Sequence, residues 1–250
     1  MLPLNYKKTP DWSFDKIASQ FDTHIRRSIP SYDRGHEIII KLLEHDISSS
    51  KERTDRTPPM PSSTHSSRFI IDLGSSSGTL TRKLARIIPD FSVLGIDIEP
   101  NMIAQSINSP ELKNLKFKCA DLLTEEFLPP DYLARAIIAY YTLCFIPQAQ
   151  RNNAIAKIYS YLEVGGMFFW FEKIRLDSPN IAKAVKDLHY DFKRQCGFSE
   201  LEIIEKERSL TEVLIPNDSH TNMNLVRNAG FREIEVIFRD FYFEGILAIK

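Results

Sequence analysis

Cysteine is scarce in this sequence, which contains only Cys119, Cys144 and Cys196 among 250 residues. They are odd in number, lie far apart and form no C-x-x-C pair, whereas disulfide frameworks need even sets and metal sites need closely spaced ligands. Free cysteines are usually buried, and Cys119 and Cys144 stand in apolar runs, so we expect both thiols to be buried. The sequence predicts neither a disulfide framework nor a metal site.

An excess of one charge and long apolar runs are also missing. The 32 basic and 33 acidic residues give a formal net charge of −1, whereas nucleic-acid-binding domains usually carry a basic excess. No run reaches the roughly 18 apolar residues of a membrane helix, and Met1–Asp11 lacks the apolar core of a signal peptide. We therefore expect a cytoplasmic protein with no membrane partner and no direct nucleic-acid partner.

Apolar residues are otherwise present in ordinary amounts, with 43% hydrophobic and 26% charged residues, which suffices for the core of one domain. The one break in composition is Asp46–Ser67, where polar residues and prolines replace the apolar pattern. Such a segment buries too little apolar surface to offset its ordering entropy, so it is predicted to be a mobile polar loop. A solvated linker is favoured over a functional lid.

This loop divides the single domain into a helical cap, residues 1–45, and an α/β unit, residues 68–250. Helical periodicity in the cap covers Asp15–His24 and Arg34–Glu44, which Pro30 separates.

Short apolar runs alternate with helical patterns in the α/β unit, which is typical of a mostly parallel sheet covered on both faces. The expected strands are Arg68–Leu73, Ser92–Asp97, Leu115–Ala120, Ala134–Tyr141 and Gly166–Phe171. The expected helices are Leu80–Ile88, one from Pro100, Gln148–Leu162, and two within Asn180–Val213, broken near Gly197.

The last two apolar runs, Arg232–Phe238 and Phe241–Ile249, are separated only by Arg239 and Asp240. This spacing predicts an antiparallel hairpin at the end of the chain. A seven-stranded, mostly parallel, Rossmann-like sheet with such a hairpin is the plan of class I methyltransferases, which use S-adenosyl-L-methionine (SAM). We predict this α/β fold class.

A strand that runs into a turn of small residues, Ile70–Gly78, is the strongest local signal. Gly74 is the first glycine, Ser76 stands where most nucleotide-binding turns have a second, and Gly78 is the third small position. Small residues let a nucleotide approach the backbone before the next helix begins. The motif alone is weak, because a strand–turn–helix with two glycines also occurs for structural reasons.

Acidic residues also end the next two expected strands. Asp97 stands where a carboxylate can accept hydrogen bonds from both ribose hydroxyls, and Asp121 stands where such folds contact adenine. Asp97 could instead cap the helix that starts at Pro100. The register of both residues with Asp72 favours a nucleoside site, because ligands of open α/β sheets bind at the carboxyl ends of the strands.

A dinucleotide cofactor is disfavoured by the same turn. The pyrophosphate of NAD(P) needs the complete G-x-G-x-x-G motif, which Ser76 interrupts. SAM has no phosphate and tolerates a looser turn, so SAM is the predicted cofactor.

Motifs along nearly the whole chain, apart from Asp46–Ser67, resemble bacterial carboxy-S-adenosyl-L-methionine (carboxy-SAM) synthases. They are Asp11–Asp15, Arg27–Tyr32, Asp72–Ser76, Leu188–Arg194, Ser199–Ile203 and Val213–Pro216. Members of that family convert SAM and prephenate to carboxy-SAM, which a partner enzyme uses to modify a tRNA wobble uridine. The resemblance implies a homodimer that does not itself act on tRNA.

The resemblance also implies which residues contact the cofactor, SAM or carboxy-SAM: Tyr32, Gly74, Ser75, Ser76, Asp97, Ile98, Asp121 and Leu122. Two positions depart from the family. Tyr140 stands in place of a cofactor-contacting Asn, and Glu207 stands in place of an Arg that holds the extra carboxylate across the dimer interface. A Glu there repels a carboxylate, and on a helix the adjacent Arg208 points about 100° away.

The remaining pocket candidates are Tyr141, His189, Glu207 and Arg208. His189 is also interpreted as a packed helix-face histidine, and Tyr140 and Tyr141 as packing residues. The departure at Glu207 favours methyl transfer from SAM to a small-molecule acceptor. Carboxy-SAM synthesis with prephenate is the alternative, and a non-catalytic SAM-binding module is the second. The pattern identifies no catalytic residue.

Overall fold

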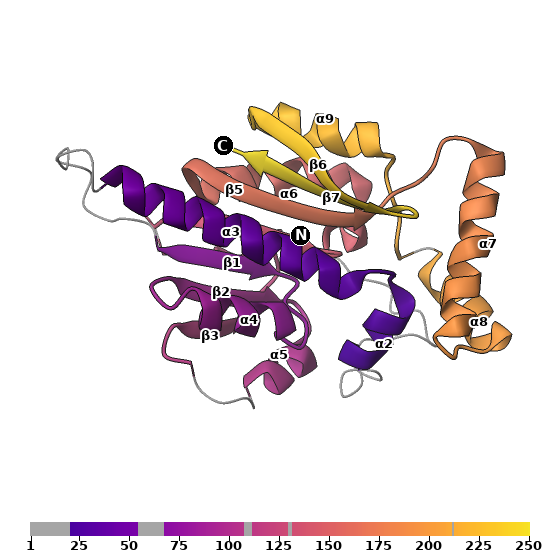
Figure 1. Cartoon of the computed structure of the whole chain (residues 1–250). Coiled ribbons are helices and arrows are strands. Elements are labelled where there is room, and N and C mark those ends of the chain that lie inside the picture. Colours follow the sequence, from indigo (N-terminus) through magenta and orange to yellow (C-terminus); the bar gives the residue numbers. More distant parts are fainter. Residues whose placement is uncertain (1–20, 55–67, 108–111, 130–131, 212) are drawn as a thin grey trace.

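The computed structural model describes residues 21–54, 68–107, 112–129, 132–211 and 213–250. Its centre is a seven-stranded sheet with the order β3-β2-β1-β4-β5-β7-β6 (Figure 1). The strands are β1 (Phe69–Leu73), β2 (Ser92–Asp97), β3 (Leu115–Cys119), β4 (Ala134–Tyr140), β5 (Leu162–Lys173), β6 (Glu233–Asp240) and β7 (Phe243–Ile249).

Neighbouring strands from β3 to β5 are parallel, and β7 is antiparallel to both β5 and β6. This confirms the predicted class I methyltransferase plan with its closing hairpin. The position of the turn was wrong by two residues, because β6 continues through Asp240 and β7 begins at Phe243. Phe241 occupies the turn with a φ of 51°.

Helices cover both faces of the sheet. They are α2 (Phe21–Ser28), α3 (Tyr32–Thr54), α4 (Thr79–Ile87), α5 (Pro100–Ile107), α6 (Gln148–Tyr161), α7 (Pro179–Gln195), α8 (Glu200–Leu210) and α9 (Ser219–Ala229). None of the helices in the described ranges is long and apolar enough to span a membrane.

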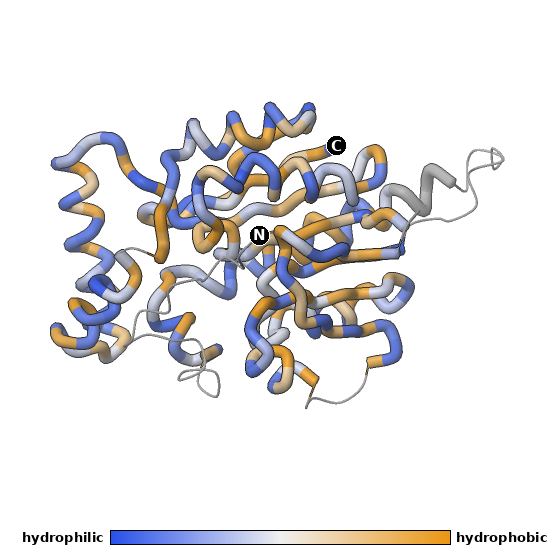
Figure 2. The backbone as a smooth tube through the Cα atoms, turned by 180° about the vertical axis from the view of Figure 1, so that it is seen from behind, coloured by the Kyte–Doolittle hydropathy of each residue, from blue (hydrophilic) through white to orange (hydrophobic). Residues whose placement is uncertain are grey.

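Adjacent residues of β5 show how the two layers arise. Successive strand residues point to opposite faces. Phe169 therefore joins a buried cluster with Ile39 of α3 and Leu84 of α4, whereas Phe168 joins another with Ile155 of α6. The view from behind shows apolar strands between helices that alternate in polarity (Figure 2). This burial of central strands on both faces explains their nearly continuous apolar sequences.

The segment Asp46–Thr54, expected to be a loop, is the last part of α3. Asp46 accepts a hydrogen bond from Arg135 Nε of β4 at 2.7 Å, and Ile47 packs against the core. The loop prediction was wrong for these residues because one ion pair and one apolar contact hold a polar helix to the sheet, which composition does not reveal. Residues 55–67 of the expected loop lie outside the described part of the chain.

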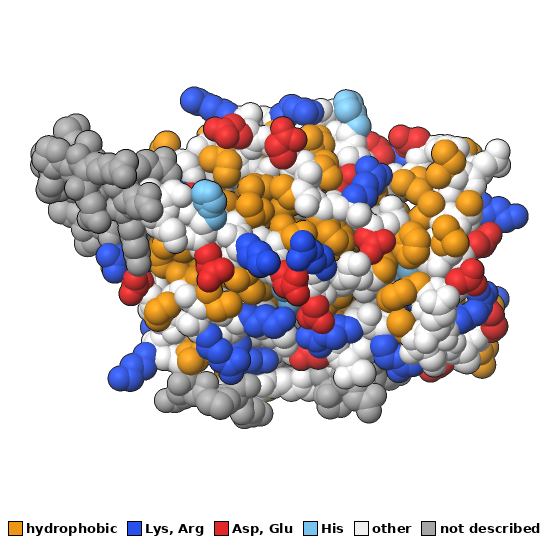
Figure 3. All heavy atoms as spheres, viewed as in Figure 1, with side chains coloured by type: hydrophobic (Ala, Val, Ile, Leu, Met, Phe, Trp, Pro, Cys, Tyr) orange, Lys and Arg blue, Asp and Glu red, His pale blue; other side chains and the backbone are white. Residues whose placement is uncertain are grey.

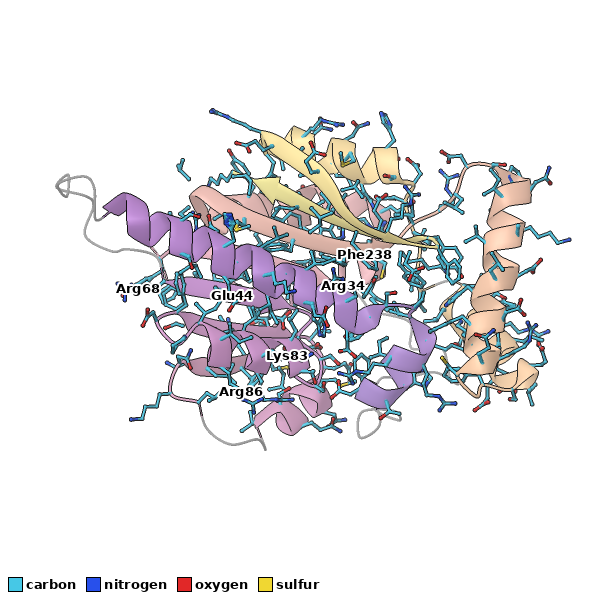
Figure 4. All side chains as sticks on the ribbon, in the orientation of Figure 1. Arg34, Glu44, Arg68, Lys83, Arg86 and Phe238 are labelled. Atoms are coloured by element: carbon cyan, nitrogen blue, oxygen red, sulfur yellow. The ribbon has the colours of Figure 1, made fainter. Side chains whose placement is uncertain are left out.

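The start of α3 is fixed to the neighbouring helix by an ion pair. Lys83 Nζ of α4 lies 3.5 Å from Asp33 Oδ1 of α3, and Figure 4 labels Lys83 beside α3. This arrangement places Tyr32 at the carboxyl end of the sheet.

Helix α9 was not expected, because its sequence is polar and buries only Asn222 and Val226. Its ends carry recognisable signals. The Asp218 side chain accepts a hydrogen bond from Thr221 N, and Gly230 ends the helix with a φ of 110°, as N-cap and C-cap residues commonly do.

Of the two cysteines expected in the interior, Cys144 is buried and Cys119 is exposed. The expectation for Cys119 was wrong because β3 is an edge strand, so its apolar run has solvent on one side.

Candidate active site

The turn after β1 is shaped by its left-handed backbone. Gly74 has a φ of 71° and Ser76 a φ of 51°. A Cβ atom on Gly74 would lie 2.2 Å from Thr142 Oγ1, so no larger residue fits there. The Gly74 and Ser75 amides donate hydrogen bonds to Ile96 O at 2.7 and 2.9 Å, which ties the turn to β2. The bare backbone of this turn lines a pocket with a volume of about 390 Å³.

Asp97 lies at the end of β2 and faces this turn. Its Oδ2 accepts a hydrogen bond from Ser76 N at 2.8 Å, and its Oδ1 accepts one from Glu99 N at 2.9 Å. Burial raises the pKa of Asp97, although these amide hydrogen bonds oppose the rise. Each carboxylate oxygen has a second lone pair, so the side chain can also accept hydrogen bonds from a ligand.

Asp72, from β1, has a structural role beside the turn. It is buried and accepts a hydrogen bond from Thr81 Oγ1 at 2.6 Å. Burial raises its pKa to about 6, while the Thr81 hydrogen bond lowers it.

Asp121 follows β3 and lines the same pocket together with Ile98 and Leu122. Its Oδ1 accepts a hydrogen bond from Leu123 N at 2.8 Å, which orders the loop. Ile98 is 48% exposed, so its side chain is accessible to a ligand in the pocket. The structure thus brings the turn, Asp97 and Asp121 together along three adjacent strand ends, as expected for an adenosine site.

Aromatic residues form the wall between α3 and the end of β4. The Tyr140 hydroxyl donates a hydrogen bond to Tyr32 O at 2.5 Å, and the rings of Tyr32 and Tyr141 stack with centroids 6.2 Å apart. All three residues line the pocket. Burial raises the pKa of Tyr140, so its hydroxyl remains a donor to α3 and the ring contributes to the pocket wall.

His189, on α7, is buried with both ring nitrogens engaged. Nδ1 contacts the Tyr242 hydroxyl, and Nε2 lies 2.8 Å from Ser28 O of α2. Burial lowers its pKa to about 3, so the ring stays neutral. This geometry supports the interpretation of a packed histidine, which joins α7 to α2 and to the turn between β6 and β7 at the pocket edge.

Glu207 and Arg208, on α8, are not among the residues that line the pocket. Glu207 forms an ion pair with Lys186 and accepts a hydrogen bond from the Tyr190 hydroxyl, both on α7. Partial burial opposes ionisation of Glu207, but these two partners outweigh it and lower its pKa. Within one chain, the carboxylate is therefore held outside the pocket with its charge paired.

Three lysines instead line the pocket where α2, α7 and α8 meet, at one end of the sheet (Figure 1). They are Lys173 at the end of β5, Lys193 on α7 and Lys206 on α8. Sequence reasoning missed them because the three come from separate elements and form no spaced motif. Elsewhere, basic and acidic side chains are interspersed on the face viewed in Figure 3. Within the described ranges, no group of three His, Cys, Asp or Glu residues could hold a metal ion.

Comparisons with known proteins agree with this fold. A family model described as "Methyltransferase domain" matches residues 70–166. The carboxy-SAM synthase of Nautilia profundicola is 34% identical over 94% of this chain and 93% of its own length. The carboxy-SAM synthase of Campylobacter jejuni serotype O:23/36 is 31% identical over 98% of this chain and 97% of its own length.

Solved structures show the same fold at lower sequence identity. A putative O-methyltransferase from Nostoc punctiforme matches with a TM-score of 0.61 and 11% identity, over 95% of this chain and 60% of that one. A putative methyltransferase of Haloferax volcanii, solved with the Trm112 activator, matches with a TM-score of 0.57 and 14% identity, over 95% and 97%. The chain is therefore a SAM-dependent transferase of the class I methyltransferase superfamily and belongs to the carboxy-SAM synthase family.

Proposed function

We propose that this protein is a carboxy-SAM synthase that uses SAM and prephenate. The observation that carries the proposal is the placement of charge around the pocket. Glu207, whose sequence position argued against a bound carboxylate, is paired with Lys186 outside the pocket. Lys173, Lys193 and Lys206 line the pocket and supply cations at other positions. An anionic ligand is favoured by this arrangement.

The turn and the strand ends fit the nucleoside portion of SAM. Asp97 would accept hydrogen bonds from the ribose hydroxyls, and Ile98 and Leu122 would flank the adenine near Asp121. The methionine portion would pass over the backbone at Gly74, where the missing Cβ permits close approach. In this arrangement the sulfonium methyl group would face the rest of the pocket.

The proposed reaction replaces one C–H bond of the sulfonium methyl group with a C–C bond to a carboxylate carbon. Prephenate supplies that carbon from its ring carboxylate and also loses its ring hydroxyl, so the ring becomes aromatic. The methyl proton and the hydroxide leave together as water. The pocket contributes chiefly by holding both reactants in one orientation, which can lower a barrier by several kcal/mol.

A homodimer is part of the proposal, since the resemblance implies one. Helices α7 and α8 expose large apolar side chains on the outside of the molecule, which are Ile181, Leu188, Leu201 and Ile204. Exposed apolar surface of this kind is typical of an association site.

The proposed activity is tested by the nucleoside that co-purifies with the protein. We expect mass spectrometry of the released ligand to find carboxy-SAM, and the purified protein to form it when SAM and prephenate are added. A protein loaded only with SAM or S-adenosylhomocysteine, and inactive with prephenate, would contradict the proposal.

Methyl transfer to a small-molecule acceptor is the second candidate, and the negative charge at Glu207 is the observation that favours it. A partner chain could bring that charge to the pocket. If our proposal is right, Glu207→Gln should change the ratio of carboxy-SAM to SAM affinity by no more than about twofold, since Lys186 already compensates the charge.

Competitive binding of the two nucleosides, read by mass spectrometry, measures that ratio. Glu205→Gln is the matched control, because Glu205 is exposed on the same helix. A tenfold gain for carboxy-SAM in Glu207→Gln alone would show that Glu207 repels the carboxylate and would favour methyl transfer.

A further inference from the structure

The three pocket lysines are brought together by elements distant in sequence. Lys173 ends a central strand, and Lys193 and Lys206 come from the two helices that lie beyond the strand ends (Figure 1). Each of them lines the same pocket as the nucleoside turn. They are therefore placed to act on whatever lies beside the nucleoside.

The environment of Lys206 is the most enclosed. Its Nζ donates a hydrogen bond to Ser28 Oγ at 3.1 Å and contacts His24 Nε2, both on α2. Burial and the nearby Lys206 charge lower the pKa of His24 to about 4, so this ring is a neutral acceptor. Lys206 thus has two neutral partners and at least one N–H available for a ligand.

Charge repulsion acts between Lys193 and Lys206 and between Lys173 and Lys193. Burial and the charge of Lys193 lower the pKa of Lys206 to about 7. Burial and the charge of Lys173 lower the pKa of Lys193 to about 8, although Glu207 acts in the opposite direction. In the described part of the chain, no carboxylate lies within 4 Å of any of these three Nζ atoms.

Partly buried cations without a paired anion are unfavourable, and a bound anion relieves both their desolvation and their mutual repulsion. We infer that Lys173, Lys193 and Lys206 form a carboxylate-binding subsite, separate from the nucleoside site, which holds a small organic dicarboxylate. This inference deepens the proposed function, because the second reactant there carries two carboxylates.

Other titratable groups surround the cluster and must be considered in any pH experiment. Those on α2, α7, α8 and β7 or its turn are His24, Lys186, His189, Tyr190, Glu207 and Tyr242. His24 and His189 stay neutral above about pH 5, because their pKa values are lowered to about 4 and 3. Glu172 also lines the pocket, and burial raises its pKa to about 7. The groups expected to titrate between pH 6 and 9 are therefore Lys193, Lys206 and Glu172.

The test is calorimetric titration of malonate, a simple dicarboxylate probe, into protein saturated with S-adenosylhomocysteine. We expect Lys193→Gln and Lys206→Gln each to weaken malonate binding at least tenfold and to change S-adenosylhomocysteine affinity less than twofold. Lys183→Gln is the matched control, because Lys183 is exposed on α7 and does not line the pocket. Neutral malonamide should not compete.

The pH dependence has a definite sign. An anion binds the charged lysines, so affinity for malonate should be greatest below pH 7 and should fall as pH rises through 7 to 8, where Lys206 and Lys193 lose their protons. Ionisation of Glu172 in the same range acts in the same direction. Lys206→Arg keeps its charge in this range, so it should retain binding at pH 8.5 better than wild type and should distinguish loss of charge from misfolding.

The subsite is overturned if both Gln variants bind malonate within twofold of wild type. It is also overturned if malonamide competes as well as malonate does. The outcome is separable from that of the proposed function. If wild type makes no carboxy-SAM but the Gln variants bind malonate more weakly, the subsite is supported and the proposed function is wrong. If wild type makes carboxy-SAM and the variants bind malonate normally, the reaction stands and the subsite is wrong.

Discussion

Asp97→Ala should weaken the binding of S-adenosylhomocysteine by about 1.5–3 kcal/mol, the value for hydrogen bonds to a charged group, which is roughly a 10- to 150-fold loss of affinity. The variant loses the acceptor for both ribose hydroxyls. It also loses the carboxylate that holds Ser76 N at 2.8 Å, so the turn itself becomes less ordered. Isothermal calorimetry measures the change.

Two further variants separate these effects. Asp97→Asn keeps one acceptor oxygen, so its affinity for S-adenosylhomocysteine should lie between those of wild type and Asp97→Ala. Asp177→Ala removes the same charge at a side chain that is 78% exposed and outside the pocket, so it should leave affinity unchanged. Because burial raises the pKa of Asp97, affinity should be full above that pKa and decline on acidification at a higher pH than for an ordinary Asp. Unchanged affinity in Asp97→Ala would remove Asp97 from the site.

Asp46→Ala should lower the free energy of unfolding by about 2–4 kcal/mol, somewhat less than the roughly 3–5 kcal/mol for breaking a fully buried ion pair. Asp46 and Arg135 are only 19% and 16% exposed. In this variant Arg135 retains its hydrogen bonds to Glu163 Oε1, at 3.2 Å, and to Gly165 O, at 3.0 Å. Its guanidinium is therefore not left without partners. Urea denaturation followed by circular dichroism measures the loss.

The control for this variant lies on the same helix. Glu37 pairs with Arg34 on the surface, with both side chains more than half exposed, so Glu37→Ala should cost well under 1 kcal/mol. A loss of similar size in both variants would mean that the Asp46–Arg135 pair adds nothing beyond a surface contact. The larger loss would also show that Asp46–Thr54 cannot be replaced by a flexible linker without a penalty.

The sequence by itself determined the order of the strands, most of the helices and the segments proposed for the nucleoside site, but neither α9 nor the end of α3. β2 and α5 begin where the apolar pattern placed them, because strand and helix periodicities are local properties of the chain. The turn at Gly74 was also readable, since a positive φ and a close approach favour small residues. Asp97 and Asp121 meet this turn because the carboxyl ends of adjacent parallel strands lie along one edge of a sheet.

Only the tertiary structure decided which charges face the pocket. Glu207 was interpreted as a carboxylate in the site, but it pairs with Lys186 of another helix. Lys173 and Lys206 come from a strand and a helix with no common motif, and Asp46 meets a residue 89 positions away. Such contacts depend on how whole helices pack against the sheet, and neither local periodicity nor composition contains that information.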